Sequence, residues 1–182
     1  MNVDDITLGM IDALNAANIP YMLVGSFSSN YYGIPRSTQD ADFVIELGNQ
    51  PIGILRRFLS AEYRVDPQMS FEGITGTYRN VVKIRGSEFK IELFRVSQDP
   101  HDRTRFDNRI TITIHGRTCF VPRAEDVIIT KLKWCRPKDR DDVRDVIAVQ
   151  DDNLDWDYIN SWCDRHGTRE LLDEIRRSIP PL

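Results

Sequence analysis

Two carboxylates two residues apart in an apolar segment are the most informative chemical feature of this sequence. Asp40 and Asp42 occur in residues 39–47, whose composition is typical of a β-strand. Side chains at positions i and i+2 of a strand point to the same side, so the two carboxylates share one face. Like charges this close raise the pKa of one group unless a cation compensates them. A hard divalent cation with oxygen ligands, such as Mg²⁺, is the natural compensator.

A glycine–serine turn precedes this strand. Residues 21–24 form a short apolar run typical of a strand, and Gly25-Ser26 interrupts it. The following residues suit a short helix that ends at Gly33. A helix that begins at Ser26 directs free backbone N–H groups toward its N-terminus, which is a favourable place for a triphosphate. An ordinary N-cap is the alternative role for Ser26, and the two roles are compatible.

A third acid, Glu92, lies in the middle of a later predicted strand. Residues 80–85 and 88–94 are two strand-like runs separated by a Gly-Ser dipeptide, which predicts a hairpin. An acid in the middle of a strand is costly to bury unless it is paired or coordinates a cation. Glu92 therefore either joins a metal site or forms a salt bridge with Lys90 or Arg95.

The combination of the turn and the paired acids resembles a known signature. Gly25-Ser26, a spacer of about a dozen residues and Asp-x-Asp in an apolar strand are similar to the signature of the polymerase-beta-type nucleotidyltransferase superfamily. Residues 36–42 (Arg-x-Thr-x-Asp-x-Asp) resemble the variant of small bacterial members. These members include antibiotic nucleotidyltransferases and the nucleotidyltransferase toxins of abortive-infection systems. The alternative is that Asp40 and Asp42 are surface carboxylates of a half-exposed strand, paired with Arg36.

The resemblance implies a fold and a reaction. The expected fold is α+β, a polymerase-beta-like mixed β-sheet flanked by helices with a C-terminal helical segment. The expected reaction transfers a nucleoside monophosphate from an NTP, such as ATP, to a hydroxyl acceptor and releases pyrophosphate. The residues implied as catalytic and as ligands of two Mg²⁺ ions are Asp40, Asp42 and Glu92. The residues implied as nucleotide-binding are Gly25, Ser26, Arg36, Thr38, Lys131, Asp139 and Asp142.

The last three of these residues belong to a helical part of the sequence. From Pro122 onward the apolar period changes from two residues to 3.6, which predicts helices. Lys131 lies at the border of a buried face, where its stem packs and its ammonium reaches a cleft. In the small nucleotidyltransferases that this segment resembles, a helix lysine contacts the triphosphate; Asp139 or Asp142 would orient Lys131. A charged, solvated helix is the alternative.

The length of 182 residues suits one domain with a small appendage. We expect residues 1–122 to form the nucleotidyltransferase core and residues 123–182 to form helices that pack on it. Three local expectations complete the secondary structure. A first helix is capped by Asp4 or Asp5, residues 52–61 form a helix, and residues 70–76 form a loop.

The net charge of the chain helps to distinguish between possible acceptors. The net charge of −4 and the sequence pI of about 5.4 provide no bulk basic footprint for nucleic acid. A small-molecule acceptor, such as an aminoglycoside- or lincosamide-like hydroxyl compound, is therefore favoured over RNA. Two other functions stay open: a non-catalytic module that binds nucleotide, RNA or a protein, and the toxin of a toxin–antitoxin pair that acts on tRNA. A local basic path for RNA would use Arg56, Arg57, Arg103 and Arg105.

The cysteines and histidines do not suggest a disulfide framework, a zinc site or a transition-metal site. Three widely spaced cysteines suggest neither a disulfide framework nor a zinc site, and free thiols fit a cytoplasmic location. The histidines at positions 101, 115 and 166 are isolated in the sequence, which predicts no transition-metal site. The N-terminus does not resemble a signal peptide, and the apolar runs are too short to span a membrane.

Overall fold

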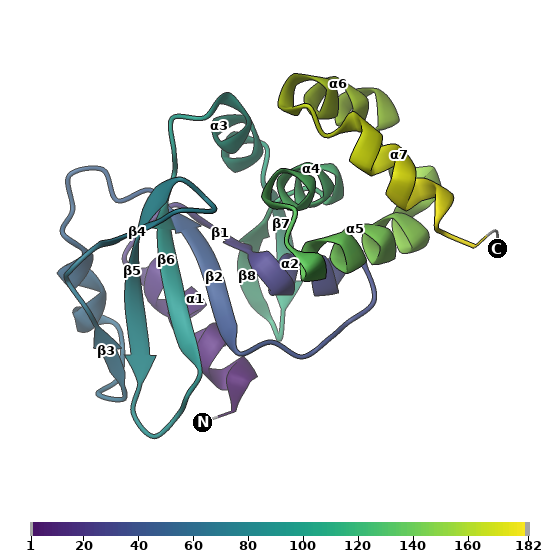
Figure 1. Cartoon of the computed structure of the whole chain (residues 1–182). Helices are drawn as coiled ribbons and strands as arrows, with labels where there is room; N and C mark the ends of the chain where they lie inside the picture. Colours follow the sequence, from purple (N-terminus) through teal and green to yellow (C-terminus); the bar gives the residue numbers. More distant parts are fainter. Residues whose placement is uncertain (1, 181–182) are drawn as a thin grey trace.

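A computed structural model of the chain describes residues 2–180 and shows an α+β fold, as predicted (Figure 1). The helices are α1 (Val3–Ala16), α2 (Gly25–Tyr32), α3 (Pro100–Asp107), α4 (Ala124–Trp134), α5 (Pro137–Gln150), α6 (Trp156–His166) and α7 (Arg169–Arg177). The strands are β1 (Tyr21–Val24), β2 (Asp40–Ile45), β3 (Tyr63–Val65), β4 (Ser70–Glu72), β5 (Thr77–Ile84), β6 (Lys90–Arg95), β7 (Ile110–Ile114) and β8 (Arg117–Val121).

The main sheet is mixed. Its strand order is β1-β2-β6-β5-β3, and the short β4 pairs with β5 outside this path. Strands β2 and β6 are parallel, whereas β1 with β2 and β5 with β6 are antiparallel. Strands β7 and β8 form a separate hairpin. The parallel pairing is the one that brings the predicted acids together, because it places two segments about 50 residues apart side by side.

The two faces of the sheet differ in chemistry. Ala41, Phe43 and Ile45 alternate along β2 toward the larger apolar core, which α1 covers. The opposite face of β2 carries Asp40 and Asp42. Period-two alternation therefore dictates that one face is a core and the other can hold polar groups. Each fully buried large apolar side chain on the core face stabilises the fold by roughly 1.5–3 kcal/mol.

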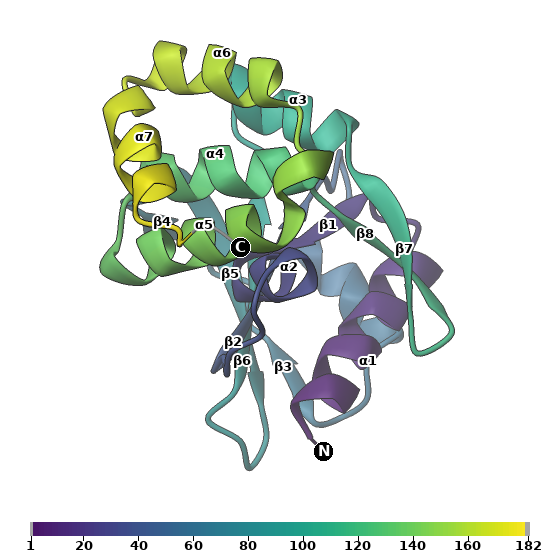
Figure 2. The same ribbon diagram turned by 90° about the vertical axis from the view of Figure 1, so that its right-hand side faces the viewer.

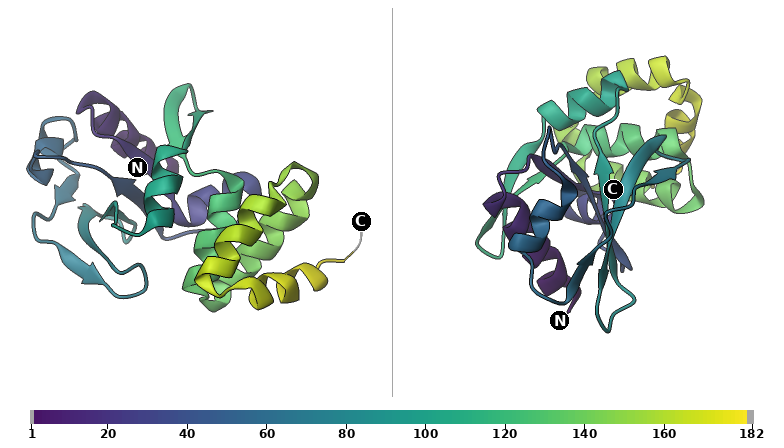
Figure 3. Two further views of the ribbon diagram at one scale, coloured as in Figure 1. Left: turned by 90° about the horizontal axis from the view of Figure 1, so that it is seen from above. Right: turned by 90° about the vertical axis from the view of Figure 1, so that its left-hand side faces the viewer.

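The C-terminal helices form a second apolar core. Residues such as Ile128, Val146, Ile159 and Leu172 pack together, and Tyr32 from α2 joins them. Figure 2 shows α4 to α7 gathered on one side of the sheet with α1 on the other, and Figure 3 shows the same grouping from above. This core ties α2, which follows the glycine–serine turn, to α4 and α5.

Three local expectations were wrong in detail. The N-cap of α1 is Asn2, whose side chain accepts the Asp5 N–H at 2.7 Å, and not Asp4 or Asp5. The predicted helix at residues 52–61 is a 3₁₀-helix that spans only Ile52–Arg57. Its two buried residues, Ile52 and Leu55, are three positions apart, which suits three residues per turn. Within the predicted loop at residues 70–76, β4 extends the sheet; three residues are too few to show a period.

Two further expectations concern the cysteines and membrane-spanning segments. All three cysteines are free, with Cys119 and Cys163 buried and Cys135 exposed. Among the helices of residues 2–180, none has the length and apolarity needed to cross a membrane.

Candidate active site

The predicted acids lie together on one face of the sheet. In the register of β2 and β6, Asp42 is directly opposite Glu92, and Asp40 is opposite Lys90. All three acids line the same pocket. We call Asp40, Asp42 and Glu92 the acid row.

Asp42 is the most perturbed member of the acid row. Burial and the negative charges of Asp40 and Glu92 together raise its pKa to about 7, while Lys131 and Arg136 act in the opposite direction. Within residues 2–180, no group donates a hydrogen bond to the Asp42 carboxylate. A carboxylate in this state is half-protonated at neutral pH, and a bound cation would return it to the charged form.

Gly25 packs directly against Asp42. Its φ is +64°, and a Cβ at this position would lie 2.2 Å from Asp42 Oδ2. Only glycine satisfies both the left-handed backbone and the close contact. The turn that starts α2 is therefore fixed beside the central carboxylate, because Val24 pairs with Asp42 across β1 and β2.

Arg36 connects the turn to α5. Its Nε and Nη2 donate to the two oxygens of Asp142 at 2.7 and 3.0 Å. Nη2 also donates to Ser26 Oγ at 3.1 Å. Arg36 thus pairs with Asp142, and not with Asp40 or Asp42 as the alternative from the sequence proposed. A nearby hydroxyl, that of Thr38, lies 3.1 Å from Asp40 Oδ1 and holds that carboxylate.

Lys131 is buried between two acids of α5. Its Nζ donates to Asp139 Oδ1 at 3.1 Å and to Asp142 Oδ2 at 2.6 Å. Only 3% of Lys131 is exposed, 0% of Asp139 and 4% of Asp142, so the alternative of a solvated helix face does not hold for them. Burial acts to raise the pKa of Asp142, but the hydrogen bonds from Arg36 and Lys131 outweigh it and lower the pKa. The α5 acids therefore hold the Lys131 side chain in place near the acid row.

Glu92 has cationic partners on both oxygens. Oε2 accepts from Arg79 at 2.8 Å and Oε1 from Lys90 at 2.5 Å. Lys90 was one of the salt-bridge partners that the sequence suggested; the other, Arg95, donates instead to Asn80 Oδ1. Each Glu92 oxygen keeps a further lone pair beside these bonds.

The pocket also has a set of basic residues that the motif did not include. Its lining contains Arg79, Arg95, Arg105, Lys133, Arg136 and Lys138. Arg136 donates to both oxygens of Asp139 at 2.6 and 3.0 Å and lies over the Trp134 ring, 5.1 Å from its centroid. One sequence signal for Arg136 was its spacing of three from Asp139 at a helix start marked by proline. No comparable local signal exists for Arg79, since its place depends on strand register.

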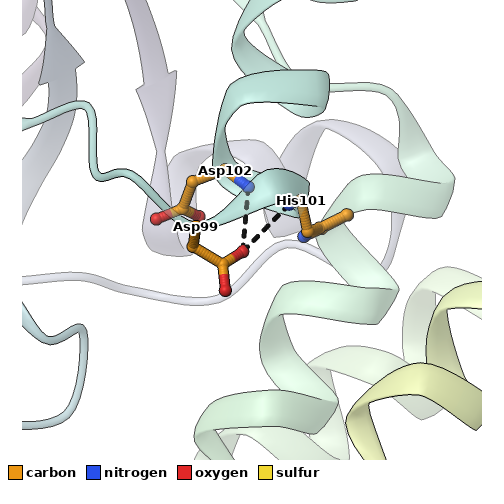
Figure 4. Close-up of side chains that lie close together, drawn as sticks. All are labelled: Asp99, His101 and Asp102. Atoms are coloured by element: carbon orange, nitrogen blue, oxygen red, sulfur yellow. Dashed lines mark hydrogen bonds between the residues drawn. The ribbon is translucent and has the colours of Figure 1, made fainter.

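A tighter group of potential metal ligands lies at the start of α3. Atoms of Asp99, His101 and Asp102 come within 4.8 Å of one another, closer than the acid row, whose Glu92 turns toward its two cations (Figure 4). Asp99 Oδ1 accepts the N–H groups of His101 and Asp102, and Asp99 Oδ2 accepts from Lys133 at 2.7 Å. These contacts are those of a helix N-cap, which accounts for the grouping without a metal.

Two of the histidines, which are isolated in the sequence, lie close together in the structure. His101 Nε2 lies 3.0 Å from Asp126 Oδ1, and both residues are buried. The His101 ring also contacts those of Trp162 and His166, with centroids 4.9 and 5.5 Å away. These residues belong to α3, α4 and α6, so only the tertiary structure brings them together.

Comparisons with known proteins agree with the fold. No protein-family model and no curated protein matches the sequence. Solved structures do match. The antibiotic-resistance factor ANT(2'')-Ia in solution superposes with a TM-score of 0.60 at 13% identity, covering 97% of this chain and 98% of that one. ANT(2'')-Ia in complex with adenylyl-2''-tobramycin gives 0.59 at 12%, covering 91% and 97%.

A fungal structure extends the comparison. An antigenic nucleotidyltransferase-like protein from Paracoccidioides brasiliensis gives a TM-score of 0.52 at 16% identity, covering 96% of this chain and 94% of that one. The predicted fold is thereby confirmed: the chain has the nucleotidyltransferase fold, which it shares with an antibiotic nucleotidyltransferase.

Proposed function

We propose that this protein is a metal-dependent nucleotidyltransferase. The single observation that carries the proposal is the Asp42 carboxylate, which lacks a hydrogen-bond donor, lies between two other acids and contacts a glycine turn at a helix start. In the reaction, an acceptor hydroxyl oxygen attacks the α-phosphorus of an NTP. The bond from the α-phosphorus to the bridging oxygen breaks, and pyrophosphate leaves with the electron pair.

The acid row fits a magnesium site in its chemistry. Its donors are carboxylate oxygens, and an unpartnered carboxylate with a raised pKa gains from a nearby cation. Asp40, Asp42 and Glu92 would hold the ions. Magnesium bound there would supply charge stabilisation for the attacking and leaving oxygens. Glu92 would also receive the proton of the acceptor hydroxyl.

The surrounding residues position the polyphosphate. Gly25 and Ser26, at the N-terminus of α2, would hold the β- and γ-phosphates through backbone N–H groups and the serine hydroxyl. Arg36 and Lys131 would neutralise charge that develops on the leaving group, and Asp139 and Asp142 keep those two cations in place. Thr38 would orient Asp40. Positioning and charge stabilisation of this kind account for most of the catalysis of phosphoryl transfer.

For the acceptor, we propose a small molecule with a free hydroxyl. One structural neighbour was solved with an adenylylated antibiotic, and the net charge of this chain is negative. The test is to incubate the protein with Mg²⁺, each of the four α-³²P-labelled NTPs and a panel of hydroxyl compounds. Label should move to an acceptor with one of the NTPs. If no NTP yields a labelled product with any acceptor while all four still bind, transfer is not the function.

A non-catalytic nucleotide-binding module is the second candidate. The observation that favours it is the pairing of both Glu92 oxygens with Arg79 and Lys90, because these two cations compensate the negative charge of Glu92 without a metal. Calorimetry with each NTP and Mg²⁺, run beside an assay of pyrophosphate release, separates the two candidates. Binding without release supports the module, and release supports the transferase.

A further inference from the structure

We propose that the acceptor carries a phosphate group, which binds to Arg79, Arg105 and Lys133 on the pocket lining. We call these three residues the basic wall. The inference rests on the proposed transferase function and names the chemistry of its acceptor. It differs from the aminoglycoside- or lincosamide-like acceptor that the net charge of the whole chain had suggested.

The pocket lining is not acidic overall. It contains six basic side chains and five acidic ones, and three of the acids form the acid row. The remaining two already have partners: Glu72 Oε2 accepts the Thr75 N–H at 2.7 Å, and Asp102 pairs with Arg105 at 3.0 Å. Outside the acid row, the described lining therefore offers the ammonium groups of an acceptor only two carboxylates, and both already have a partner. An aminoglycoside would meet cations instead.

The basic wall is distinct from the proposed triphosphate site. Gly25 directly follows β1, whereas Arg79 lies on β5, and the strand order β1-β2-β6-β5 puts the acid row between them. A phosphate bound at Arg79 would thus lie on the far side of Glu92 from the turn. This is the side on which an acceptor has to approach if the NTP binds at Gly25.

The other two members come from α3 and α4. Arg105 Nη1 donates to Thr130 on α4 at 3.2 Å, and Lys133 donates to Asp99 just before α3 at 2.7 Å. The two helices are therefore joined at the place where these cations line the pocket, and they lie next to each other in Figure 1.

The arginines of the basic wall have donors to spare. Arg105 is only 5% exposed, yet its contacts are Thr130 and the ion pair with Asp102. The Nε atom of Arg79 is buried without a hydrogen-bond acceptor among the described residues, and the Nε atom of Arg105 lies 3.0 Å from Asp102 Oδ1. A guanidinium has five N–H donors in a planar fork that matches phosphate oxygens. A phosphate in the pocket would accept charge-assisted hydrogen bonds from the guanidinium N–H groups that line it.

Matched ligands test the phosphate directly. AMP and adenosine have the same hydroxyls and differ only in the phosphate. Calorimetry is run with Mg²⁺ and a saturating α,β-methylene NTP analogue, which blocks the NTP site. AMP should bind about tenfold or more tightly than adenosine. Equal affinities, binding of neither, or tighter binding of an aminoglycoside such as kanamycin than of AMP overturns the proposal.

Variants locate the phosphate site. Lys133→Gln should reduce the preference for AMP several-fold without unfolding the protein, because Lys133 is exposed and pairs only with Asp99 among residues 2–180. Arg79→Gln should do the same and also releases Glu92. Lys83→Gln and Arg85→Gln, both exposed and outside the pocket, are the matched controls. An unchanged preference in Lys133→Gln and Arg79→Gln overturns the basic wall.

The outcome is separable from that of the proposed function. If the protein prefers AMP through these residues but never releases pyrophosphate, the phosphate site is supported and the transferase proposal fails. If the protein transfers nucleotide to acceptors that carry no phosphate, the transferase proposal is supported and the phosphate site fails.

Discussion

Asp42 of β2 and Glu92 of β6 lie directly opposite each other on parallel strands, on the face of the sheet that is turned away from the main core. The two acids are about 50 residues apart in the sequence, and a third acid, Asp40, precedes Asp42 on the same face. Their mutual repulsion adds to the effect of burial and raises the pKa of Asp42 to about 7. An arrangement of acids that is unfavourable in the protein alone is favourable once a cation binds to it.

Gly25→Ala should impair both stability and nucleotide binding. The added Cβ would meet Asp42 Oδ2 at 2.2 Å, and the left-handed backbone alone costs a non-glycine residue about 1–2 kcal/mol. Urea unfolding and NTP calorimetry measure the two effects. Gly53→Ala is the control, because nothing lies within 4 Å of its Cβ and its φ is not positive. Wild-type stability and affinity in Gly25→Ala would contradict the close contact.

Asp42→Asn should change how stability depends on pH. The folded-state pKa of Asp42 lies above its unfolded value of about 4, so the native state binds more protons than the unfolded state between about pH 4 and 7. The wild-type protein therefore loses stability as pH rises through this window without metal, on the order of 2 kcal/mol, and Asp42→Asn should not. Urea unfolding at pH 5 and 8 in EDTA measures this, with exposed Asp157→Asn as the control. Parallel pH profiles for wild type and Asp42→Asn would refute it.

Lys131→Met should destabilise the fold strongly. It leaves Asp139 and Asp142 buried without their shared cation, and removal of one partner from a buried ion pair costs about 3 kcal/mol or more. Lys133→Met, two residues along the same helix and exposed, should change the free energy of unfolding by less than about 0.5 kcal/mol. Chemical denaturation of the pair provides the comparison. Similar losses of unfolding free energy in the two variants would show that the buried ion pairs of Lys131 do not contribute more to stability than the exposed pair of Lys133.

The same network predicts acid sensitivity. Hydrogen bonds from Arg36, Arg136 and Lys131 outweigh burial and lower the pKa of Asp139 and Asp142. Stability from these groups is fully present above the unfolded pKa of about 4 and is lost as pH falls through the lower folded values. Asp142→Asn should therefore flatten the wild-type loss of stability below pH 4 in thermal unfolding. A slope equal to that of the wild type would rule this out.

Two acidic groups compete as the metal site, and one variant of each decides between them. Mn²⁺ binding in the presence of an NTP, measured by calorimetry, should be lost in Asp42→Asn. It should persist in Asp99→Asn, because the contacts of Asp99 are those of a helix N-cap and asparagine is as good a cap. The opposite pattern would assign the metal to the start of α3.

The central motif could be predicted because its parts are local. The β1 strand, the Gly25 turn and the alternation around Asp42 follow from composition and period within about 25 residues. The hairpin that carries Glu92 was also predicted from its turn. The parallel pairing of β2 with β6 was not a local property, and only the family resemblance suggested it.

The rest of the pocket depends on long-range register. Arg79 faces the pocket because β5 pairs with β6, and no nearby residue in the sequence marks it as different from other strand arginines. Asp126 pairs with His101 from another helix. The apolar period predicted the helix α4, but an acid in the first turn of a helix, as Asp126 is, carries no local signal of a histidine partner. Strand β4 was missed because Phe71 and its neighbours form too short a segment and are exposed.

The most direct test of the account is pyrophosphate release by the wild-type protein and Asp42→Asn, measured with each NTP, Mg²⁺ and the acceptor panel, with circular dichroism to confirm that both are folded. The account predicts release by the wild type with at least one NTP and a loss of more than about a hundredfold in Asp42→Asn. Release by Asp42→Asn at the wild-type rate would contradict it.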